Sequence, residues 1–458
     1  MSTSILHIKP EEIDSVEKRR EYRVGIIGCG RNGIFHACLF AEAGFNIICA
    51  DANRALVNHL TKGKSPFQKR KVEPLLKKHL KNGCLKATND VKAAVAESDV
   101  VLVTTRAKID RKKKVTYLDL EKACKQVGST LQCGSLVIVM SVIGPTTAET
   151  VVRETLENTS GFKAGIDFGL AYNPIRVGER ALGKLAGCER IVAARDKHSL
   201  DAASIVLGTI TQKDLVRTND VKTAEAAVLF EFVQHYANVA LANEFASFCE
   251  KAGIDYFKMK ELAEANAHGT LVSPTVACRN IREEPYLLLD EAENLNVKLR
   301  IPAIAMEMNE EILKHTVGLI RESLRNCGKT LRRAKVSLLG ISQTKNTKDI
   351  QNASAKKLAK NLETKGAKVR LYDPYLSHKD LADSTQLFRK NLKEAIEGVD
   401  CIVIFTGHDR FKRLNLKRLK IMARMPAGIV DLEGVVDPEK AEMEGFIYRG
   451  LGRGVSTK

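Results

Sequence analysis

Three glycines near the N-terminus have the spacing of a loop that binds a dinucleotide. They lie in the segment Gly28-Cys-Gly-Arg-Asn-Gly33, and Asp51 follows at the end of the next apolar run. Gly28 suits a tight turn, Gly30 lets the backbone approach a pyrophosphate, and Gly33 lets a helix pack closely on a strand. A carboxylate at Asp51 would bond a ribose 2′-hydroxyl and repel a 2′-phosphate, so the pattern predicts NAD as the cofactor. The competing interpretation is a glycine-rich turn that no longer holds a cofactor.

The elements around this loop are those of a βαβ unit. Residues 22–27 are typical of a buried strand, and the helical pattern that follows the loop ends at Ala43, before Gly44. Residues 45–50 form a second apolar strand that leads to Asp51. The start of the helix would present its free N–H groups to the phosphates. Further strands are expected at residues 100–104 and 136–142.

A long uninterrupted helix is expected in the middle of the chain. Residues 218–220 are of the capping type, and the helical pattern continues to Ala252 before Gly253. About 32 residues at a rise of 1.5 Å would give a helix of about 48 Å. Helices of this length join domains or form dimers, so we expect a homodimer.

The last part of the chain repeats the first in outline. Strands are expected at residues 335–340, 368–372, 401–406 and 428–431, with a helix that runs to Lys365 and an aspartate, Asp373, after the second strand. The predicted fold class is α/β, with two Rossmann-like doubly wound domains joined by a long helical spine. The expected domains are a charged leader at 1–20, an NAD-binding domain at 21–215, a central helical dimerisation domain at 216–330 and a C-terminal Rossmann-like domain at 331–458.

The composition of the chain favours some classes of ligand and partner and argues against others. The 458 residues include 73 Lys and Arg against 55 Asp and Glu, a net charge of +18, which favours anionic ligands. Aromatic residues are 5% of the chain and Trp is absent, so a nucleic-acid partner is not expected. Eleven cysteines without a C-x-x-C pair, and no apolar run of about 18 residues, indicate free thiols in the cytoplasm and no membrane span.

Several segments in order along the chain resemble the UDP-glucose/GDP-mannose dehydrogenase family. They are residues 62–66 with 73–76, 98–104, 140–147, 240–244, 249–255, 372–375 and 448–454. The resemblance runs from about Tyr22 to Gly454. It implies that Asn32, Thr104 and Ser141 join the glycines and Asp51 in the NAD site. It also implies that the C-terminal domain binds a nucleotide sugar.

Enzymes of this family oxidise a sugar alcohol to a carboxylate in two NAD-dependent steps, with a cysteine that captures the aldehyde. A glutamate assists hydrolysis, and lysine and asparagine side chains stabilise the oxyanion. This sequence departs at those positions. By alignment with the family's segments, the Glu, Lys, Asn, Cys and Arg positions are occupied by Ile175, Val228, Phe232, Asn280 and Gln351. Glu179 lies one helical turn after Ile175, and the lysine of the substrate segment has moved by one position, to Lys345.

Four residues remain as candidates for chemistry. Cys278 is two positions from Asn280, and is either a thiol in a rearranged loop or a buried structural cysteine. Glu284 keeps a carboxylate where the family has an aspartate. Ser141 and His235 are further candidate bases, although His235 among apolar neighbours is expected to be a packed histidine.

Two functions are compatible with these replacements. One is a divergent NAD-dependent oxidoreductase that acts on a CH–OH group and stops after one hydride transfer. The other is a catalytically silent homologue that binds NAD or a nucleotide sugar as a sensor or as the partner of an active paralogue. The apolar Val228 and Phe232 favour the silent homologue, whereas the intact glycine loop with Asp51 favours the enzyme.

Overall fold

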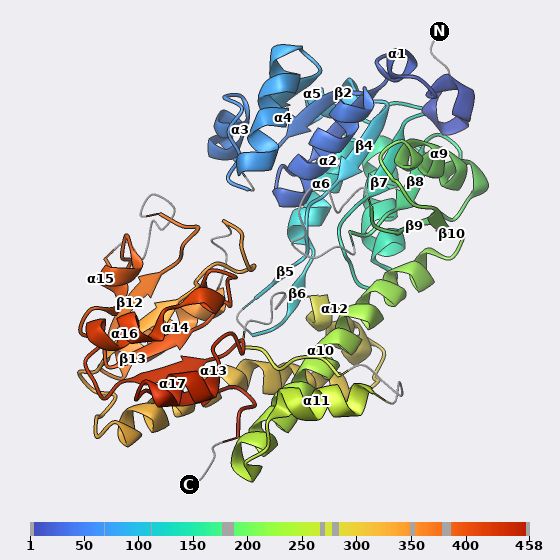
Figure 1. Cartoon of the computed structure of the whole chain (residues 1–458). Coiled ribbons are helices and arrows are strands. Elements are labelled where there is room, and N and C mark those ends of the chain that lie inside the picture. The colour runs from blue at the N-terminus through green and yellow to red at the C-terminus, as the bar shows by residue number, and fades with distance from the viewer. Residues whose placement is uncertain are drawn as a thin grey trace. The chain divides into compact units, whose positions relative to one another are not determined.

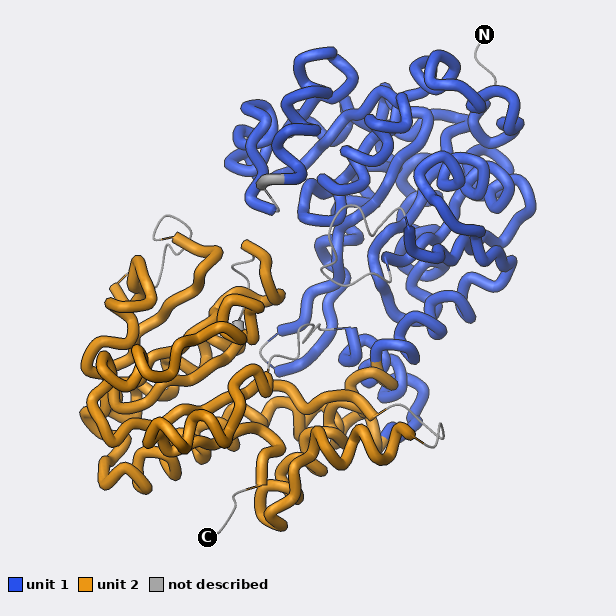
Figure 2. The backbone as a smooth tube through the Cα atoms, in the orientation of Figure 1, with its two compact units in different colours: residues 1–232, 282–299 blue, residues 233–281, 300–458 orange. Residues whose placement is uncertain are grey.

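The computed structural model describes residues 4–67, 69–110, 112–175, 187–265, 271–276, 284–348, 353–377 and 386–454. The chain divides into two compact units, shown in different colours in Figure 2. Unit 1 comprises residues 1–232 and 282–299, and unit 2 comprises residues 233–281 and 300–458. The long helix α10 (Val221–Ala252) contributes residues to both. Its bounds confirm the sequence prediction, and Gly253 after it has a φ of 73°.

Unit 1 is built on an eight-stranded sheet with the order β10-β9-β8-β7-β4-β1-β2-β3 (Figure 1). Neighbouring strands are parallel except β8 and β9, which pair antiparallel. The strands are β1 (Arg23–Ile27), β2 (Asn46–Ala50), β3 (Leu85–Thr88), β4 (Val100–Val103), β7 (Leu136–Val139), β8 (Gly169–Tyr172), β9 (Arg190–Ala193) and β10 (Leu215–Thr218). A separate hairpin pairs β5 (Lys108–Ile109) with β6 (Val115–Thr116).

Helices cover both faces of this sheet (Figure 1). Alternate strand residues such as Val24 and Ile26 share one core cluster with helices α2, α4 and α9, because side chains of a strand alternate between its faces. Helix α5 contacts β1 and β2 outside that cluster. The helices of unit 1 are α1 (Val16–Arg19), α2 (Arg31–Ala43), α3 (Arg54–Leu60), α4 (Lys69–Lys81), α5 (Val91–Ala96), α6 (Leu118–Gly128), the π-helix η3 (Ala148–Arg153), α7 (Glu154–Ser160), α9 (Lys197–Gly208) and α12 (Glu284–Asn294).

Unit 2 is built on a five-stranded parallel sheet with the order β12-β11-β13-β14-β15. Its strands are β11 (Lys335–Leu339), β12 (Lys368–Tyr372), β13 (Cys401–Ile404), β14 (Gly428–Asp431) and β15 (Ile447–Gly450). Val336 and Leu338 pack with α14, whereas Leu339 and Ile402 belong to a second cluster with α16 and α17. The helices are α11 (Tyr256–Glu264), α13 (Arg300–Asn326), α14 (Ala353–Thr364), α15 (Leu392–Ile396), α16 (Leu416–Met422) and α17 (Pro438–Met443).

The predicted fold class, with two doubly wound units and a long helix, is therefore confirmed. Among the described residues, no helix combines the length and the apolar character that crossing a membrane requires. The ten cysteines of the described ranges are free thiols.

Candidate functional site

The glycine loop of unit 1 joins β1 to α2, and its geometry requires glycine at two positions. Gly28 has a φ of 96°, in the left-handed region. A Cβ on Gly33 would lie 2.1 Å from the carbonyl oxygen of Gly28, so any side chain would push α2 away from β1. A Cβ on Gly30, by contrast, would meet no atom within 4 Å. Gly30 is the N-cap of α2, and its open side is the surface that a pyrophosphate would approach.

Asp51 and Thr104 hold this loop from the two neighbouring strands. The Asp51 carboxylate, at the end of β2, accepts the backbone N–H of Cys29 at 2.6 Å and that of Asn53 at 2.8 Å. The Thr104 hydroxyl, after β4, donates to the carbonyl oxygen of Gly28. Asp51 is half-buried, and a carboxylate with about four acceptor sites keeps capacity for ribose hydroxyls.

Ser141 and Asn32, the remaining residues predicted for the NAD site, make different contacts. Ser141 is buried after β7, and its hydroxyl donates to the carbonyl oxygen of Thr105 at 2.7 Å. Asn32 is half-buried in the first turn of α2, and its backbone carbonyl lies 2.8 Å from Nδ1 of His36. His36 is fully buried beneath this turn, and burial, reinforced by the charge of Arg190, lowers its pKa to about 3.

Glu225 is a buried carboxylate near the site that no sequence motif predicted. It lies on α10, is fully buried, and accepts the backbone N–H groups of Thr146 at 2.6 Å and Ala148 at 2.8 Å. Burial raises the pKa of this carboxyl to about 8, although the two N–H groups oppose the shift. Thr146 has a φ of 72°, so Glu225 fixes an unfavourable turn in the segment that follows Ser141.

Of the two residues predicted to be catalytic, Glu284 and Cys278, the structure describes only Glu284. Glu284 is the half-buried first residue of α12. A Cβ added to Gly144 would lie 3.9 Å from the carbonyl oxygen of Leu287, so the first turn of α12 lies near the turn that Glu225 holds. Cys278 lies outside the described residues, as do Glu179, Asn280 and Gln351.

The apolar residues predicted to occupy the family's polar positions are part of the core. Ile175, Val228 and Phe232 are all buried. The expectation of a packed histidine at position 235 is wrong, because His235 is on the exposed face of α10 and its apolar neighbours are on the buried face. Val228 lies close to one helical turn after Glu225 on α10.

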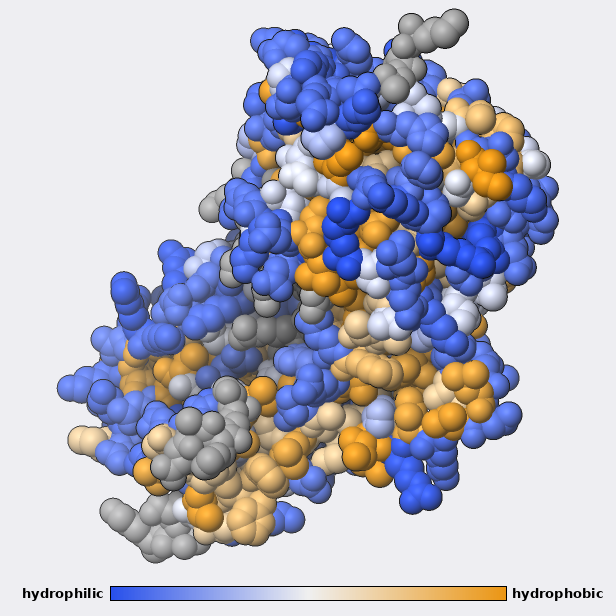
Figure 3. Space-filling model, turned by 90° about the vertical axis from the view of Figure 1, so that its right-hand side faces the viewer, coloured by the Kyte–Doolittle hydropathy of each residue, from blue (hydrophilic) through white to orange (hydrophobic). Residues whose placement is uncertain are grey.

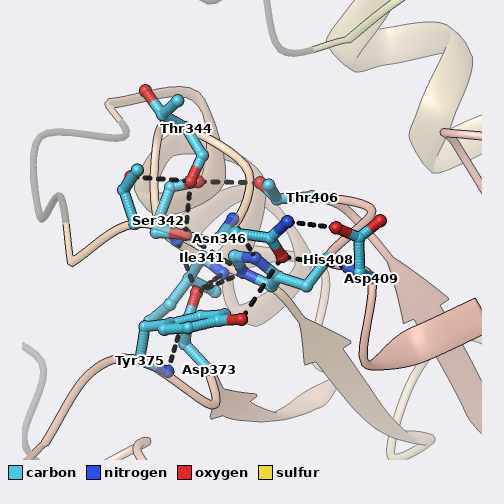
Figure 4. Close-up of polar contacts among 10 residues, drawn as sticks. Ile341, Ser342, Thr344, Asn346, Asp373, Tyr375, Thr406, His408 and Asp409 are labelled. Carbon is cyan, nitrogen blue, oxygen red and sulfur yellow. Dashed lines mark hydrogen bonds and ion pairs between the residues drawn. The ribbon is translucent and has the colours of Figure 1, made fainter. Parts of the chain in front are cut away.

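Unit 2 contains a dense polar cluster at the corresponding end of its sheet (Figure 4). Asp373, which follows β12, is 1% exposed, and its Oδ2 accepts the N–H groups of Ile341 and Ser342 at 2.9 and 2.8 Å. His408 is fully buried, with Nε2 3.0 Å from the same oxygen. The hydroxyl of Thr406 donates to the carbonyl oxygen of Ser342 at 2.8 Å. These contacts were not predicted from the sequence.

A cavity of about 450 Å³ lies elsewhere in unit 1. Its walls include Ala148, Arg153, Tyr172 and Arg195. None of the residues predicted for the cofactor site lines this cavity. The glycine loop is therefore distinct from this cavity.

Three family models match consecutive parts of the chain. The model described as UDP-glucose/GDP-mannose dehydrogenase family, NAD binding domain, matches residues 22–210. The model of the central domain matches residues 222–311, and that of the UDP binding domain matches residues 337–438. The glycine loop and Asp51 lie in the first match, and the polar cluster around Asp373 and His408 lies in the third.

Full-length relatives support the same assignment. A UDP-N-acetyl-D-mannosamine dehydrogenase of Pyrococcus horikoshii is 28% identical over 435 residues, which are 94% of this chain and 99% of the relative. A GDP-mannose 6-dehydrogenase of Pseudomonas putida is 25% identical over 91% of this chain and 97% of its own. The solved structure of a UDP-D-ManNAc dehydrogenase from Pyrococcus horikoshii superposes with a TM-score of 0.83 at 27% identity, covering 94% of this chain and 99% of the other.

Proposed function

Because the chain belongs to the UDP-glucose/GDP-mannose dehydrogenase family, we propose that it is an NAD-dependent oxidoreductase that acts on a CH–OH group of a UDP-sugar or a similar nucleotide sugar. The observation that carries the proposal is the complete glycine loop, with Gly28, Gly30, Gly33 and Asp51 in place. The matches to NAD-binding and UDP-binding domains supply the two ligand classes. Relatives named for UDP-N-acetyl-D-mannosamine and GDP-mannose support a nucleotide sugar as the substrate.

We further propose that oxidation stops after one hydride transfer. Bound NAD supplies the hydride acceptor, and the alcohol becomes a carbonyl when its O–H proton passes to a carboxylate. Glu284 is our candidate for that carboxylate. A second oxidation needs groups that stabilise an oxyanion, and the buried apolar side chains of Val228 and Phe232 cannot donate a hydrogen bond.

The direct test measures NADH formation with NAD and a panel of UDP- and GDP-sugars. The proposal expects one NADH per sugar consumed, and a Glu284→Gln variant that binds NAD normally but turns over about a hundredfold more slowly. A Cys278→Ser variant serves as the control, because a single hydride transfer requires no thiol. Two NADH per sugar, with activity lost in Cys278→Ser, would exclude the one-step reaction. Tight NAD binding without turnover on any sugar would contradict the dehydrogenase function.

A homodimer is also proposed, with α10 in its interface. Hydrophobic patches are exposed on the face of the molecule drawn in Figure 3. On α10, Leu241, Phe245 and Phe248 are 45%, 39% and 64% exposed, at a spacing that places them on one helix face. Exposed apolar stripes of this kind mark protein interfaces. Light scattering should give a dimer mass, and Phe248→Glu should give a monomer. A monomeric wild-type chain would exclude this assembly.

A further inference from the structure

The segment between β11 and α14 begins with a conformation fixed by neighbouring strand ends. Gly340 has a φ of 78°, and a Cβ there would lie 2.2 Å from the carbonyl oxygen of Thr406. After this close approach, Asp373 accepts the N–H groups of Ile341 and Ser342. The first residues of the segment therefore have no freedom to move without breaking buried hydrogen bonds.

His408 extends this control to the far end of the segment, as Figure 4 shows. Its Nδ1 accepts the backbone N–H of Asn346 at 2.9 Å. A ring nitrogen that accepts carries no proton, so the hydrogen is on Nε2, which donates to Asp373 at 3.0 Å. One fully buried ring thus joins the two ends of the segment formed by residues 341–346.

Asn346, whose backbone N–H is accepted by His408, has an unfavourable backbone conformation. Asn346 has a φ of 60°, in the left-handed region that costs energy for residues other than glycine. Its side chain reinforces the turn, since its Oδ1 accepts the N–H of Asp409 at 3.0 Å and its amide donates to the Asp409 carboxylate. The direction of the preceding residue depends on this turn.

The residue before Asn346 is Lys345, whose side-chain ammonium forms an ion pair with Asp409. Its Nζ lies 3.0 Å from the Asp409 carboxylate, and its side chain is 29% exposed. The Lys345 ammonium and the Asn346 amide together hold the pKa of Asp409 below its usual range, so Asp409 is ionised near neutral pH. An ammonium on a fixed turn, paired with a displaceable carboxylate, is suited to a phosphate ligand.

We propose that His408 is a positioning residue for the diphosphate of the nucleotide sugar. It accepts the Asn346 N–H, fixes the left-handed turn, and so sets the direction in which Lys345 meets the ligand. The inference rests on the proposed function, because it presumes that unit 2 binds a nucleotide. It assigns His408 no contact with the ligand.

Two substitutions separate this role from a general contribution to the core. His408→Asn retains a carbonyl oxygen near the position of Nδ1, so it keeps an acceptor for Asn346 but loses the donor to Asp373. His408→Gln retains a polar group near the position of Nε2, so it keeps the contact with Asp373 but leaves the Asn346 N–H without an acceptor. Both variants lose the ring contacts with Tyr375 and Phe411. A merely structural residue would show comparable effects in both.

The experiment is a calorimetric titration of UDP into the full-length variants. His408→Gln should weaken UDP binding about tenfold, which corresponds to one lost hydrogen bond to the turn. His408→Asn should stay within about twofold of the wild type. NAD affinity, which depends on unit 1, should be unchanged in both, and thermal unfolding would check that each variant is folded.

A double-mutant cycle tests whether the effect passes through Lys345. If it does, Lys345→Ala weakens UDP binding in the wild type but adds little in His408→Gln. Equal UDP affinities of His408→Asn and His408→Gln, or additive effects of Lys345→Ala and His408→Gln, would overturn the proposal. Failure of the wild-type chain to bind UDP would instead contradict the nucleotide-sugar function on which it rests, and this inference would fall with it.

Discussion

Asp51 and Asp373 each follow the second strand of a parallel unit, and each accepts N–H groups from the turn after the first strand. Their surroundings differ. Asp51 is half-buried and accepts one backbone N–H on each oxygen. Asp373 is 1% exposed, and its Oδ2 alone contacts two backbone N–H groups and His408. An acidic residue that keeps acceptor capacity can bind a ribose, whereas one with its acceptors occupied can only stabilise its own turn.

The turn after β1 and the turn after β11 also differ in how much space they leave open. In unit 1, Gly33 brings α2 close to β1, and the open side of Gly30 leaves space at the helix start. In unit 2, the turn continues from Gly340 through residues 341–346 and is held by His408. Similar strand topology is therefore followed by an open glycine turn in one unit and by a longer, hydrogen-bonded loop in the other, so the fold alone does not assign the cofactor.

The largest expected effect separates the two roles of glycine in unit 1. Gly33→Ala places a Cβ 2.1 Å from a backbone oxygen, so it should both abolish NAD binding and lower the free energy of unfolding by about 2 kcal/mol. Gly30→Ala adds a Cβ to open space and should leave unfolding unchanged while NAD binding weakens. Chemical denaturation and NAD titration measure the two quantities. Equal stability losses in both variants would refute the distinction.

The next prediction tests Asp51 against Asp373. Asp51→Asn should weaken NAD binding about tenfold and reduce discrimination against NADP, because the charge that repels a 2′-phosphate is lost. Asp373→Asn should leave NAD affinity as it is and destabilise the fold, since it replaces a buried acceptor of several hydrogen bonds. Fluorescence titration with NADH and NADPH measures the preference. An altered NAD affinity in Asp373→Asn would break the contrast between the units.

A third prediction concerns pH and Glu225. Burial raises the pKa of Glu225 in the folded chain to about 8, so the folded chain favours the protonated carboxyl. This group's contribution to the stability of the fold is therefore complete below its ordinary pKa near 4.5 and is lost as the pH rises through about 8. Glu225→Gln removes this loss. The difference between the unfolding midpoint of the variant and that of the wild type should therefore increase by about 5 °C, in favour of the variant, from pH 5 to pH 9. Parallel midpoint curves for the two proteins would show that Glu225 does not titrate in this range.

The smallest effect is expected at Asp409, in the loop of unit 2. Asp409→Asn removes the carboxylate that neutralises Lys345 at 3.0 Å, so UDP binding should strengthen about threefold at low salt. The gain should shrink as ionic strength rises. Asp437→Asn, which removes the carboxylate of a different exposed ion pair of unit 2, is a control with the same change of net charge. Weaker UDP binding in Asp409→Asn would indicate that Asp409 helps to hold the ligand.

Much of the fold was predictable because local signals agree with the tertiary structure. The predicted strand of residues 22–27 differs from β1 by one residue, and α10 begins after Asp220, whose carboxylate accepts the N–H of Thr223. The strands β3 and β10 were missed because they lie at sheet edges and have no continuous apolar run. Helix α13 lies in the region expected to be helical, 216–330, but the sequence did not predict its bounds, since it contains Pro302 and Gly318. Proline is tolerated there because it lies in the first turn, where its missing N–H leaves no bond unmade.

The site was predictable only in part, for a related reason. The glycine loop is a contiguous motif, so its residues could be named from the sequence. The contacts of His408 join residues more than sixty positions apart, from Ser342 and Asn346 to His408, and no local pattern encodes them. Glu225 accepts the N–H of Thr146, 79 positions away, and this contact depends on a turn that only the folded chain defines.

The most direct test of the contrast between the units is a calorimetric titration of NAD into the full-length chain. The structure predicts one NAD per chain, bound by the glycine loop of unit 1 and bound more weakly in Gly30→Ala. Two NAD molecules per chain, or one that survives Gly30→Ala unchanged, would contradict the assignment of the cofactor to that loop.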